Sequence, residues 1–286
     1  MEYFIASDSF WIMFTGALVA VSCGLLGCYL VLRQMAMIGD AISHAVLPGI
    51  VIAFLLTNSL SSVPAVLGAA SVGLFSTFLI ETVHRKGRLQ SDASIGMIFT
   101  FMFALGVIMI AWKADNVDLD QECVLYGEVA FVTFDPPVLG MPVSTLILLG
   151  NLLLIALFIG IGYRGLFLTT FDPSYAKAIG ISTAFWHYSL MGMVSMTSVV
   201  SFESVGAILV VAFLIGPAAI AHLLTDRMPV MLSIATVSGI IASIGGYYLA
   251  SYLNASVAGA MTSVLGIEFI IVLLLAPGRG LLRTSS

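Results

Sequence analysis

The chain has 286 residues, of which 60% are hydrophobic and 9% are charged, whereas an ordinary soluble domain carries roughly 25% charged residues. A mean hydropathy of +1.13 excludes a water-soluble globule, because a soluble fold of this length needs a charged and polar coat. The net charge of −5 is spread along the chain and indicates no nucleic-acid partner. Apolar runs continue from residue 10 to residue 276, which predicts one multi-pass, all-α membrane domain over residues 1–286.

Segments long enough to cross a bilayer, which takes about 20 helical residues, follow one another along the chain. Nine crossings are expected, and eight also fit the pattern. The segments cover residues 10–32, 40–57, 64–83, 93–112, 142–163, 182–201, 204–224, 229–250 and 257–276. The first lacks the basic start of a secretory signal and is expected to be retained; its Cys23 and Cys28 are expected to be packed thiols. The second is short and is interrupted at Pro48 and Gly49.

The basic residues are sorted between the two sides of the membrane. With nine crossings, one side receives only Lys113. The other side receives Arg33, Arg85, Lys86, Arg88, Arg164, Lys177, Arg227, Arg279 and Arg283. Because basic residues accumulate in cytoplasmic loops, the count predicts a cell-membrane protein with its N-terminus outside and its C-terminus in the cytoplasm.

Two connections are longer than a turn. The outer one, 113–137, is acidic, and its apolar part, 124–134, is expected to form a short helix at the outer mouth. The inner one contains Asp172 as a candidate N-cap, Pro173 at the first helical position and Gly180 as a stop, which predicts a short cytoplasmic helix. That helix either only connects two spans or is a docking element for a cytoplasmic partner.

Ionisable residues inside a span are functional candidates, because an ionisable group at mid-bilayer costs about 2.5–3.5 kcal/mol. Those in or beside the expected spans are Asp40, His44, Glu81, Asp92, His187, Glu203, His222 and Glu268. All except Asp40, His44 and Glu268 lie within a turn or two of an interface, where water or headgroups are expected to solvate them. Glu268 is deep in the ninth span, and either faces a transport path or is a neutral, hydrogen-bonded carboxyl.

Asp40 and His44 form the most informative pair. Their i, i+4 spacing places both side chains on one helix face, about 6 Å apart along the axis, so a carboxylate oxygen and an imidazole nitrogen can converge on one ion. Mixed oxygen and nitrogen ligation without thiolate favours manganese or iron over copper. A purely structural Asp–His contact is the alternative. Pro48 and Gly49 follow one turn later and loosen the helix where a permeation path needs exposed carbonyls.

The chain carries no sign of its own energy source or of catalysis. It has no Gly-x-x-x-x-Gly-Lys-Ser/Thr stretch, so ATP, if used, is hydrolysed by another chain. It has no nucleophile–base constellation and no His-Glu-x-x-His run in a span, which argues against an intramembrane protease or transferase. The composition and motifs therefore favour transport over enzymatic activity, with no permanently bound cofactor.

The segment 31–49, VLRQMAMIGDAISHAVLPG, resembles the signature of the metal-ion ABC transporter permeases, the zinc, manganese and iron uptake family. Weaker matches follow in order at 92–96, 125–128, 178–180, 204–210 and 216–219. The resemblance covers nearly the whole chain. It implies a homodimeric permease with a path at or near the subunit interface, two cytoplasmic ATP-binding cassette subunits, and an extracytoplasmic metal-binding protein that delivers the ion.

The resemblance also implies roles for single residues. It makes Asp40 and His44 the intramembrane metal-contacting pair, which dimerisation would double. It makes the short inner helix the element that couples the permease to the ATPase. The coupling residues are Asp172, Pro173, Tyr175, Lys177 and Gly180. Glu268 and Glu203 are further candidate metal contacts, although the family's pattern does not place Glu268.

Residues 40–49 resemble the manganese branch more than the zinc branch, so the expected cargo is manganese first and zinc or iron next. Two rival functions remain open. A siderophore or corrinoid importer permease shares the architecture but should lack the Asp–His pair and line its path with larger, mostly uncharged surfaces. A cation-coupled secondary carrier needs no partner ATPase and would transport in vesicles made with this chain alone.

Overall fold

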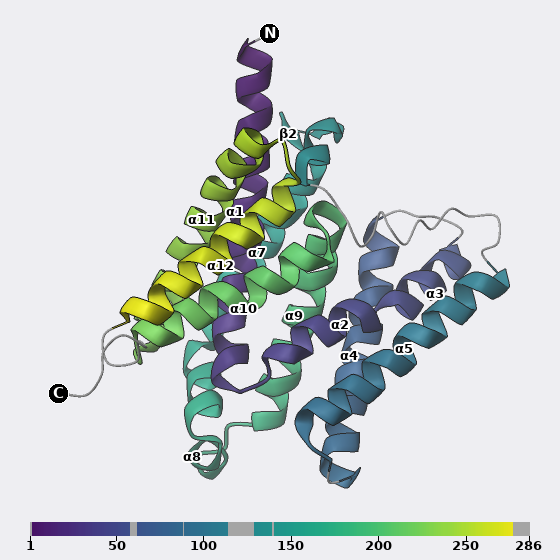
Figure 1. Ribbon diagram of the computed structural model, residues 1–286. Helices are drawn as coiled ribbons and strands as arrows, with labels where there is room; N and C mark the ends of the chain where they lie inside the picture. The colour runs from purple at the N-terminus through teal and green to yellow at the C-terminus, as the bar shows by residue number, and fades with distance from the viewer. Residues whose placement is uncertain (1, 58–61, 88, 114–128, 139, 277–286) are drawn as a thin grey trace. The chain divides into compact units, whose positions relative to one another are not determined.

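The computed structural model describes residues 2–57, 62–87, 89–113, 129–138 and 140–276, and almost all of them are helical (Figure 1). The helices before the longest connection are α1 (Glu2–Leu32), α2 (Ala36–Ala45), α3 (Leu47–Thr57), α4 (Ser62–Gly87) and α5 (Ser91–Lys113). Those after it are η1 (Val129–Phe134), α7 (Val143–Phe171), α8 (Pro173–Ala178), α9 (Thr183–Val205), α10 (Ala207–Leu224), α11 (Met228–Leu253) and α12 (Val257–Leu275). The predicted all-α class is confirmed.

Eight helical segments of the described chain are long and apolar enough to cross a membrane, which lies within the predicted range. They are Asp8–Leu32, Ala36–Thr57, Leu67–His84, Asp92–Trp112, Val143–Phe171, Ala207–Leu224, Met228–Leu253 and Val257–Leu275. The predicted crossing at 182–201 corresponds to α9, which has 23 residues but is not among the eight. Its many Ser and Thr residues, together with His187, make it less apolar than the others. The orientation of the chain and the homodimer stay predictions.

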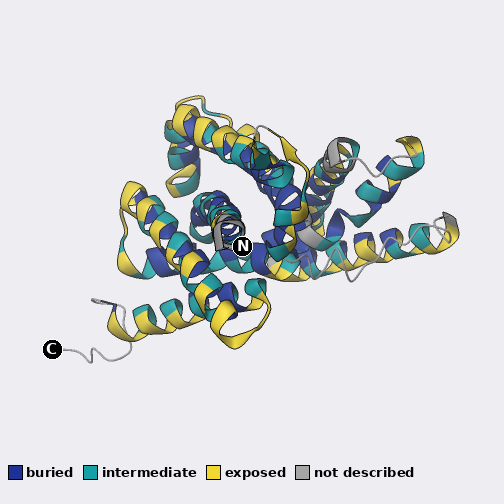
Figure 2. Ribbon diagram, turned by 90° about the horizontal axis from the view of Figure 1, so that it is seen from above, coloured by how far each residue is buried: buried dark blue, intermediate teal, exposed yellow. Residues whose placement is uncertain are grey.

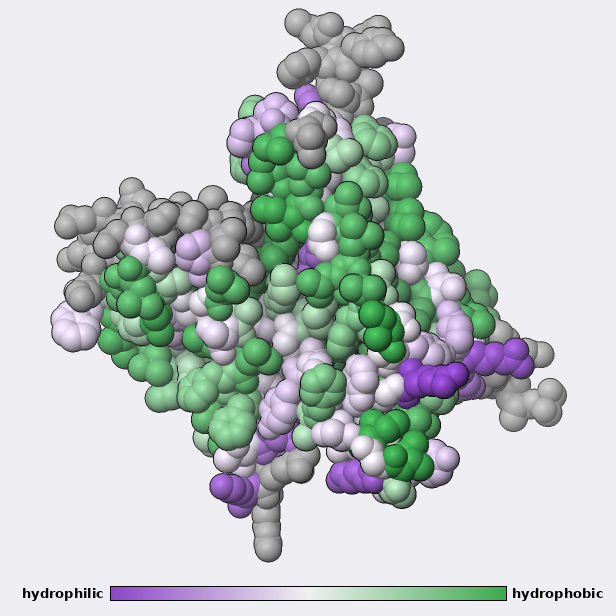
Figure 3. All heavy atoms as spheres, turned by 180° about the vertical axis from the view of Figure 1, so that it is seen from behind, coloured by the Kyte–Doolittle hydropathy of each residue, from purple (hydrophilic) through white to green (hydrophobic). Residues whose placement is uncertain are grey.

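Large apolar side chains are exposed along many helices. Examples are Leu56, Trp112, Ile161 and Tyr252, each more than three-quarters exposed. Exposed residues follow the outward faces of the helices in Figure 2, and apolar side chains cover most of the face in Figure 3. Since a soluble protein rarely exposes apolar patches of this extent, these faces are suited to lipid.

The chain divides into two compact units. The first contains Met1–Gln34, Cys123–Gly160 and Ser201–Ser286, and the second contains Met35–Glu122 and Ile161–Val200. Helix α7 therefore begins in the first unit and ends in the second, whereas α9 begins in the second and ends in the first. The single domain expected over residues 1–286 stays a prediction.

In the first unit, α1 packs against α10 and α11, and α12 packs against α10 and α11. Glycines allow these contacts, since small residues let helix backbones approach where lipid gives no hydrophobic drive. A Cβ on Gly27 would overlap the Leu214 carbonyl, and a Cβ on Gly246 would overlap the Met261 backbone. Substitution at either glycine would therefore push two helices apart.

Helix α1 also contains both cysteines whose surroundings the structure describes. Cys23 and Cys28 are buried and free. The Cys28 thiol lies 3.9 Å from the Met231 carbonyl oxygen, which it faces as a weak donor. These observations confirm the prediction of packed thiols.

In the second unit, α2 and α3 pack against α4 and α5. Gly49 of α3 and Gly68 of α4 meet so closely that a Cβ on either would overlap the carbonyl oxygen of the other. A Cβ on Gly73 of α4 would overlap the Ser195 hydroxyl of α9 and lie 3.4 Å from Ile42 Cγ2 of α2. Helices α2, α4 and α9 thus meet around Gly73.

The predicted interruption of the second span lies between α2 and α3. Val46 separates the two helices, and its carbonyl accepts the Gly49 and Ile50 N–H groups at 2.8 and 3.2 Å. Pro48 lies at the second position of α3, where a missing N–H is tolerated. Pro48 also has no N–H to offer the His44 carbonyl four residues earlier. The sequence therefore breaks the helix one turn after the Asp–His pair.

The short outer helix is present as η1, a 3₁₀ helix over Val129–Phe134. The remaining part of the expected helix, 124–128, lies outside the described residues. After η1, the antiparallel strands β1 (Pro137–Val138) and β2 (Met141–Pro142) lead into α7. Asp135 accepts hydrogen bonds from the Ser144 N–H and hydroxyl. A carboxylate at that point is favourable because the N-terminus of a helix carries partial positive charge.

The short inner helix is α8, and its predicted start and stop are both confirmed. Asp172 is the N-cap, with its Oδ1 accepting the Tyr175 N–H at 2.9 Å. Pro173 occupies the first turn. Gly180, at φ +85°, adopts the left-handed conformation that glycine tolerates best, and the chain then turns into α9.

Candidate functional site

Asp40 and His44 lie together on α2, as their spacing predicts. Asp40 Oδ1 is 3.6 Å from His44 Nε2. Their side chains are 37% and 32% exposed, whereas Ala41, Ile42 and Ala45 of the same helix are buried. Helix α2 therefore buries one face in the second unit and presents the carboxylate and the imidazole on the other.

Two aromatic rings of α5 contact the His44 imidazole. The ring centroids of Phe99 and Phe103 lie 6.1 and 6.0 Å from that of His44, and Phe103 is nearly perpendicular to it at 86°. These contacts limit the rotation of the imidazole. They therefore hold Nε2 in place on the side of Asp40.

The separation of Asp40 and His44 suits a shared cation. A charge-assisted hydrogen bond between them would be about 2.7–2.9 Å long, which is shorter than the 3.6 Å observed. Two tetrahedral ligands with bonds of about 2.1 Å are about 3.4 Å apart. Among the described residues, no group of three or more His, Cys, Asp or Glu side chains could hold a metal ion. The pair therefore offers two side-chain ligands, which suits brief binding.

A second carboxylate–imidazole pair lies between two helices of the same unit. Glu81 Oε2 of α4 is 3.4 Å from His187 Nε2 of α9. Their side chains are 18% and 16% exposed. Water or headgroups were expected to solvate these two residues, but α4 and α9 bring them together in a mostly buried position. No sequence spacing reveals the pair, since its members lie on helices far apart in the chain.

Three other ionisable candidates are placed differently. Asp92 is exposed in the first turn of α5, where its charge is favourable. His222 is half-buried in the last turn of α10. Glu203 is on α9, but its side chain lies outside the described part of the chain. A metal contact by Glu203 stays a prediction.

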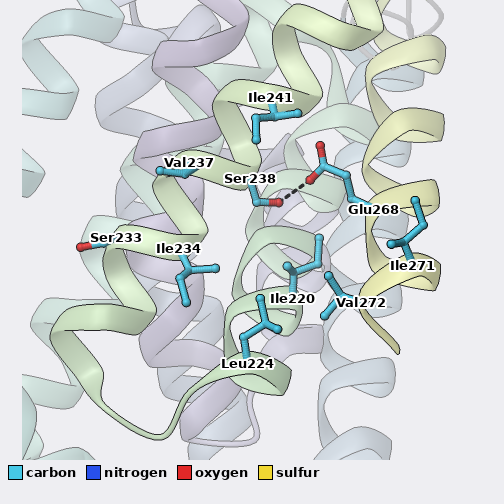
Figure 4. Close-up of a pocket in the computed structure, with 10 residues that line it drawn as sticks. All are labelled: Ile220, Leu224, Ser233, Ile234, Val237, Ser238, Ile241, Glu268, Ile271 and Val272. Atoms are coloured by element: carbon cyan, nitrogen blue, oxygen red, sulfur yellow. Dashed lines mark hydrogen bonds between the residues drawn. The ribbon is translucent and has the colours of Figure 1, made fainter. Parts of the chain in front are cut away.

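Glu268 lies in the first unit and lines a cavity of about 430 Å³ between α10, α11 and α12 (Figure 4). The Ser238 hydroxyl donates a hydrogen bond of 2.6 Å to Glu268 Oε2. The other oxygen, Oε1, is buried without a hydrogen-bond partner among the described residues. The remaining lining residues are Ile220, Leu224, Ser233, Ile234, Val237, Ile241, Ile271 and Val272. The cavity is therefore mainly aliphatic and supplies no imidazole or second carboxylate to an ion, so the metal contact by Glu268 stays a prediction.

Arg33 follows α1 directly and begins the turn that leads to α2. Its side chain is partly buried, and this burial lowers the pKa of the guanidinium to about 10, with the nearby Tyr29 opposing the shift. A group with this pKa is still protonated at neutral pH. Arg33 therefore keeps the positive charge that the count of basic residues assigns to the cytoplasmic side.

Three apolar side chains are exposed at α8 and just beyond its two ends, and we call them the exposed stripe. Phe171, Tyr175 and Ile179 follow one another at i, i+4 and i+8 and are each about half exposed (48%, 53% and 49%), while Ala176 is buried. Phe171 is the last residue of α7, Tyr175 lies in α8, and Ile179 follows the end of α8. Helix α8 lies where the chain turns between α7 and α9 (Figure 1).

The two helices beside α8 are closely packed against each other. The Trp186 ring of α9 lies over Gly162 and Gly165 of α7, and a Cβ at either glycine would meet its ring atoms. Helices α7, α8 and α9 therefore form a hairpin whose two long arms are held together by a tryptophan.

These features define a multi-pass α-helical membrane protein with a carboxylate–imidazole pair beside a broken helix and a short exposed helix between two long ones. The chain matches the model of the ABC 3 transport family over residues 8–276. It belongs to the ABC 3 transport family, and with its apolar helices it is a protein of the cell membrane. The resemblance seen in residues 31–49 is confirmed.

Known relatives include membrane proteins of metal transport systems. The chain is 47% identical over 276 residues to the manganese transport system membrane protein MntD of Bacillus subtilis, covering 95% of this chain and 93% of that protein. It is 40% identical over 279 residues to the zinc transport system membrane protein TroD of Treponema pallidum, covering 95% and 75%. A solved structure, PsaBC from Streptococcus pneumoniae in complex with Fab, is similar with a TM-score of 0.79 and 32% identity, covering 94% of this chain and 92% of that one.

Proposed function

We propose that this chain is the permease subunit of an ABC importer that moves a divalent transition-metal ion into the cytoplasm, manganese first and zinc or iron next. The observation that carries the proposal is the Asp40–His44 pair, held 3.6 Å apart on a helix that is broken one turn later. The names of MntD and TroD, which specify manganese and zinc transport, support this class of cargo. The cargo is a transported substrate, and no permanently bound cofactor is proposed.

The pair acts as a transient ligand set. A carboxylate and an imidazole replace part of the hydration shell of the ion inside the membrane, where an unpaired charge is costly. Several strong ligands on one chain would trap the ion, whereas one carboxylate and one imidazole per chain let it leave. A second copy of the chain would contribute another carboxylate and another imidazole at the subunit interface, so the homodimer is part of the proposal.

Manganese is the first choice because of the ligand types. Carboxylate oxygen suits a hard ion, and imidazole suits most first-row metals. A thiolate would favour copper or zinc, but Cys23 and Cys28 are packed inside α1 in the first unit. Selection between manganese, zinc and iron then depends on the delivery protein and on metal availability in addition to this site.

Energy for transport comes from a cytoplasmic ATP-binding cassette subunit, so this chain is not itself an enzyme. The exposed stripe of Phe171, Tyr175 and Ile179 provides apolar area for docking, and Lys177 of α8 is also exposed. The Trp186 contact joins α7 and α9, so movement of α8 is transmitted to both. An extracytoplasmic metal-binding protein is expected to dock on the opposite side and deliver the ion.

Metal accumulation in cells tests the proposal. The chain is produced with its ATP-binding and metal-binding partners in a strain that lacks other manganese importers, and manganese, zinc and iron uptake are measured. Asp40→Ala and His44→Ala should abolish uptake at unchanged membrane levels, whereas His84→Ala, on the exposed end of α4, should not. Normal accumulation of all three metals in both α2 variants would remove the proposed ligands.

A vesicle experiment separates the importer from a secondary carrier. Proteoliposomes that contain this chain alone should show no ATP-dependent or gradient-driven manganese uptake. Addition of the ATP-binding subunit and the metal-binding protein should produce uptake that requires ATP. Uptake driven by an ion gradient with the chain alone would favour the carrier.

A further inference from the structure

We propose that Glu81 and His187 form a second divalent-cation site, which receives the ion on the cytoplasmic side of Asp40 and His44. We call Asp40 and His44 the α2 pair, and Glu81 and His187 the α4–α9 pair. The inference rests on the proposed function, because it assigns the next position on the same import route. It gives the chain two successive sites of the same ligand chemistry.

The ligand atoms of the α4–α9 pair lie at a distance that suits a shared cation. Glu81 Oε2 and His187 Nε2 are 3.4 Å apart, longer than the about 2.7–2.9 Å of a charge-assisted hydrogen bond. Two ligands on one tetrahedral ion with bonds of about 2.1 Å are separated by about 3.4 Å. The two atoms are therefore spaced as ligands of a common cation.

The α4–α9 pair lies at a different level along the helices from the α2 pair. Gly73 of α4 and Ser195 of α9 are in contact. Glu81 lies eight residues after Gly73 on α4, and His187 lies eight residues before Ser195 on α9. The two helices are therefore antiparallel through this region. Eight residues of α-helix span about 12 Å. Since Ile42 of α2 lies beside Gly73, the α4–α9 pair is about two helical turns beyond the level of the α2 pair.

The direction of that displacement agrees with import. Beyond Glu81, α4 runs to its end at Gly87, in the connection where the basic residues predict the cytoplasm. Before His187, α9 begins at Thr183, directly after α8. The α4–α9 pair therefore lies near the predicted inner end of both helices.

Burial makes the α4–α9 pair energetically costly in the absence of a cation. A carboxylate and an imidazole that are more than four-fifths buried carry a desolvation cost, which an ion pair recovers only with close contact and good geometry. Apolar side chains would join α4 and α9 at less cost. A site that holds a cation between its two members explains why polar groups of these two kinds occupy the position.

Manganese titration tests the second site directly. The full chain with its ATP-binding subunit is reconstituted in lipid nanodiscs, and free Mn²⁺ is followed by electron paramagnetic resonance. In a background of Asp40→Asn and His44→Gln, which removes the α2 pair, one class of bound Mn²⁺ should remain. Adding Glu81→Gln or His187→Gln should weaken that class by at least about tenfold. His84→Gln, an exposed imidazole one turn along α4, is the matched control and should leave it unchanged.

A second variant covers the case in which the glutamine substitutions disturb folding. His187→Cys replaces an imidazole by a thiolate, which binds soft cations more strongly. The variant should bind Cd²⁺ at least about tenfold more tightly than the unsubstituted background does. The residual Mn²⁺ affinity is unchanged by Glu81→Gln and His187→Gln, or the Cd²⁺ affinity is unchanged by His187→Cys, if the pair only joins two helices. Either result would overturn the second site.

The outcome is separable from that of the proposed function. If the wild-type complex imports no metal, the importer proposal fails. If uptake requires Asp40 and His44 while Mn²⁺ and Cd²⁺ binding are insensitive to Glu81 and His187, the importer stands and the second site alone is overturned.

Discussion

The two compact units accommodate a carboxylate inside a membrane helix in different ways. In the second unit, Asp40 and Glu81 each face an imidazole at 3.6 and 3.4 Å. In the first unit, Glu268 accepts one hydrogen bond from Ser238 in a mainly aliphatic cavity. An imidazole adds a second ligand for a cation, whereas a neutral hydroxyl donor satisfies one carboxyl oxygen. The difference suggests a test: an acid inside a membrane helix is expected to bind an ion when its neighbour is also a ligand.

The two pairs of the second unit also differ from each other. Asp40 and His44 share one helix and are about one-third exposed, while Glu81 and His187 join two helices and are mostly buried. Loss of the α2 pair should therefore affect the ion but hardly the packing. Loss of one member of the α4–α9 pair should affect both.

The largest effect is expected when a carboxylate is replaced by its amide in each of the two units. Asp40→Asn should lower manganese uptake by about 100-fold, because it removes a charged ligand from a site with few others. Glu268→Gln should stay within about twofold of wild type, since an amide still accepts the Ser238 hydrogen bond. Uptake of radioactive manganese, normalised to membrane levels, measures both. An equal loss of manganese uptake in the two variants would contradict the distinction between the units.

The next effect separates stability from transport at the α4–α9 pair. Glu81→Ala leaves the His187 imidazole buried without this partner and should lower the free energy of unfolding by about 3 kcal/mol. Replacing the pair together, by Glu81→Met and His187→Leu, should restore most of the stability, because apolar residues pack without a desolvation cost. Thermal unfolding of the complex in nanodiscs measures the first quantity and uptake measures the second. Full uptake in the double variant would contradict a role in ion transfer.

A smaller effect is expected on α8. Tyr175→Ala removes the centre of the exposed stripe and should weaken association with the ATP-binding subunit by about tenfold, the usual loss for an aromatic contact residue. Co-purification of the subunit at increasing dilution gives the change in affinity. Tyr252→Ala is the matched control, because that tyrosine is 85% exposed at the end of α11, on the side predicted to be outside.

The smallest effect concerns the cap of the same helix. Asp172→Ala removes the acceptor of the Tyr175 N–H and should cost about 1 kcal/mol of local stability. Asp172→Asn keeps an acceptor at the N-cap and should cost much less. Hydrogen exchange of the α8 amides compares the two variants with wild type. Equal exchange in all three proteins would show that the cap does not stabilise α8.

Local features of the chain were predictable because they depend on neighbours in the sequence. The i, i+4 spacing of Asp40 and His44 placed both on one face of α2, and the order Asp172, Pro173, Gly180 marked the beginning and end of α8. The sequence also predicted a break in the second span, at Pro48 and Gly49; the helices separate at Val46, two residues earlier. Such signals act within one or two helical turns, so they require no knowledge of packing.

Contacts between helices were not predictable in the same way. Water or headgroups were expected to solvate Glu81 and His187, yet the two side chains are mostly buried and face each other. The environment of Glu268 was also open, because a single deep carboxylate is compatible with a transport path or with a hydrogen-bonded cavity. Helix packing decides between such cases, and it depends on small residues such as Gly73, whose neighbours in space come from other helices.

The sequence by itself determined that this protein is a membrane protein built of long helices, and that a carboxylate and an imidazole share one turn of α2. These features were determined because composition and short spacings are properties of the chain. Only the tertiary structure decided that a second carboxylate meets a second imidazole and that Glu268 faces a serine among aliphatic side chains. The physical reason is that helices are joined where their surfaces fit, and those fits link residues that are distant along the chain.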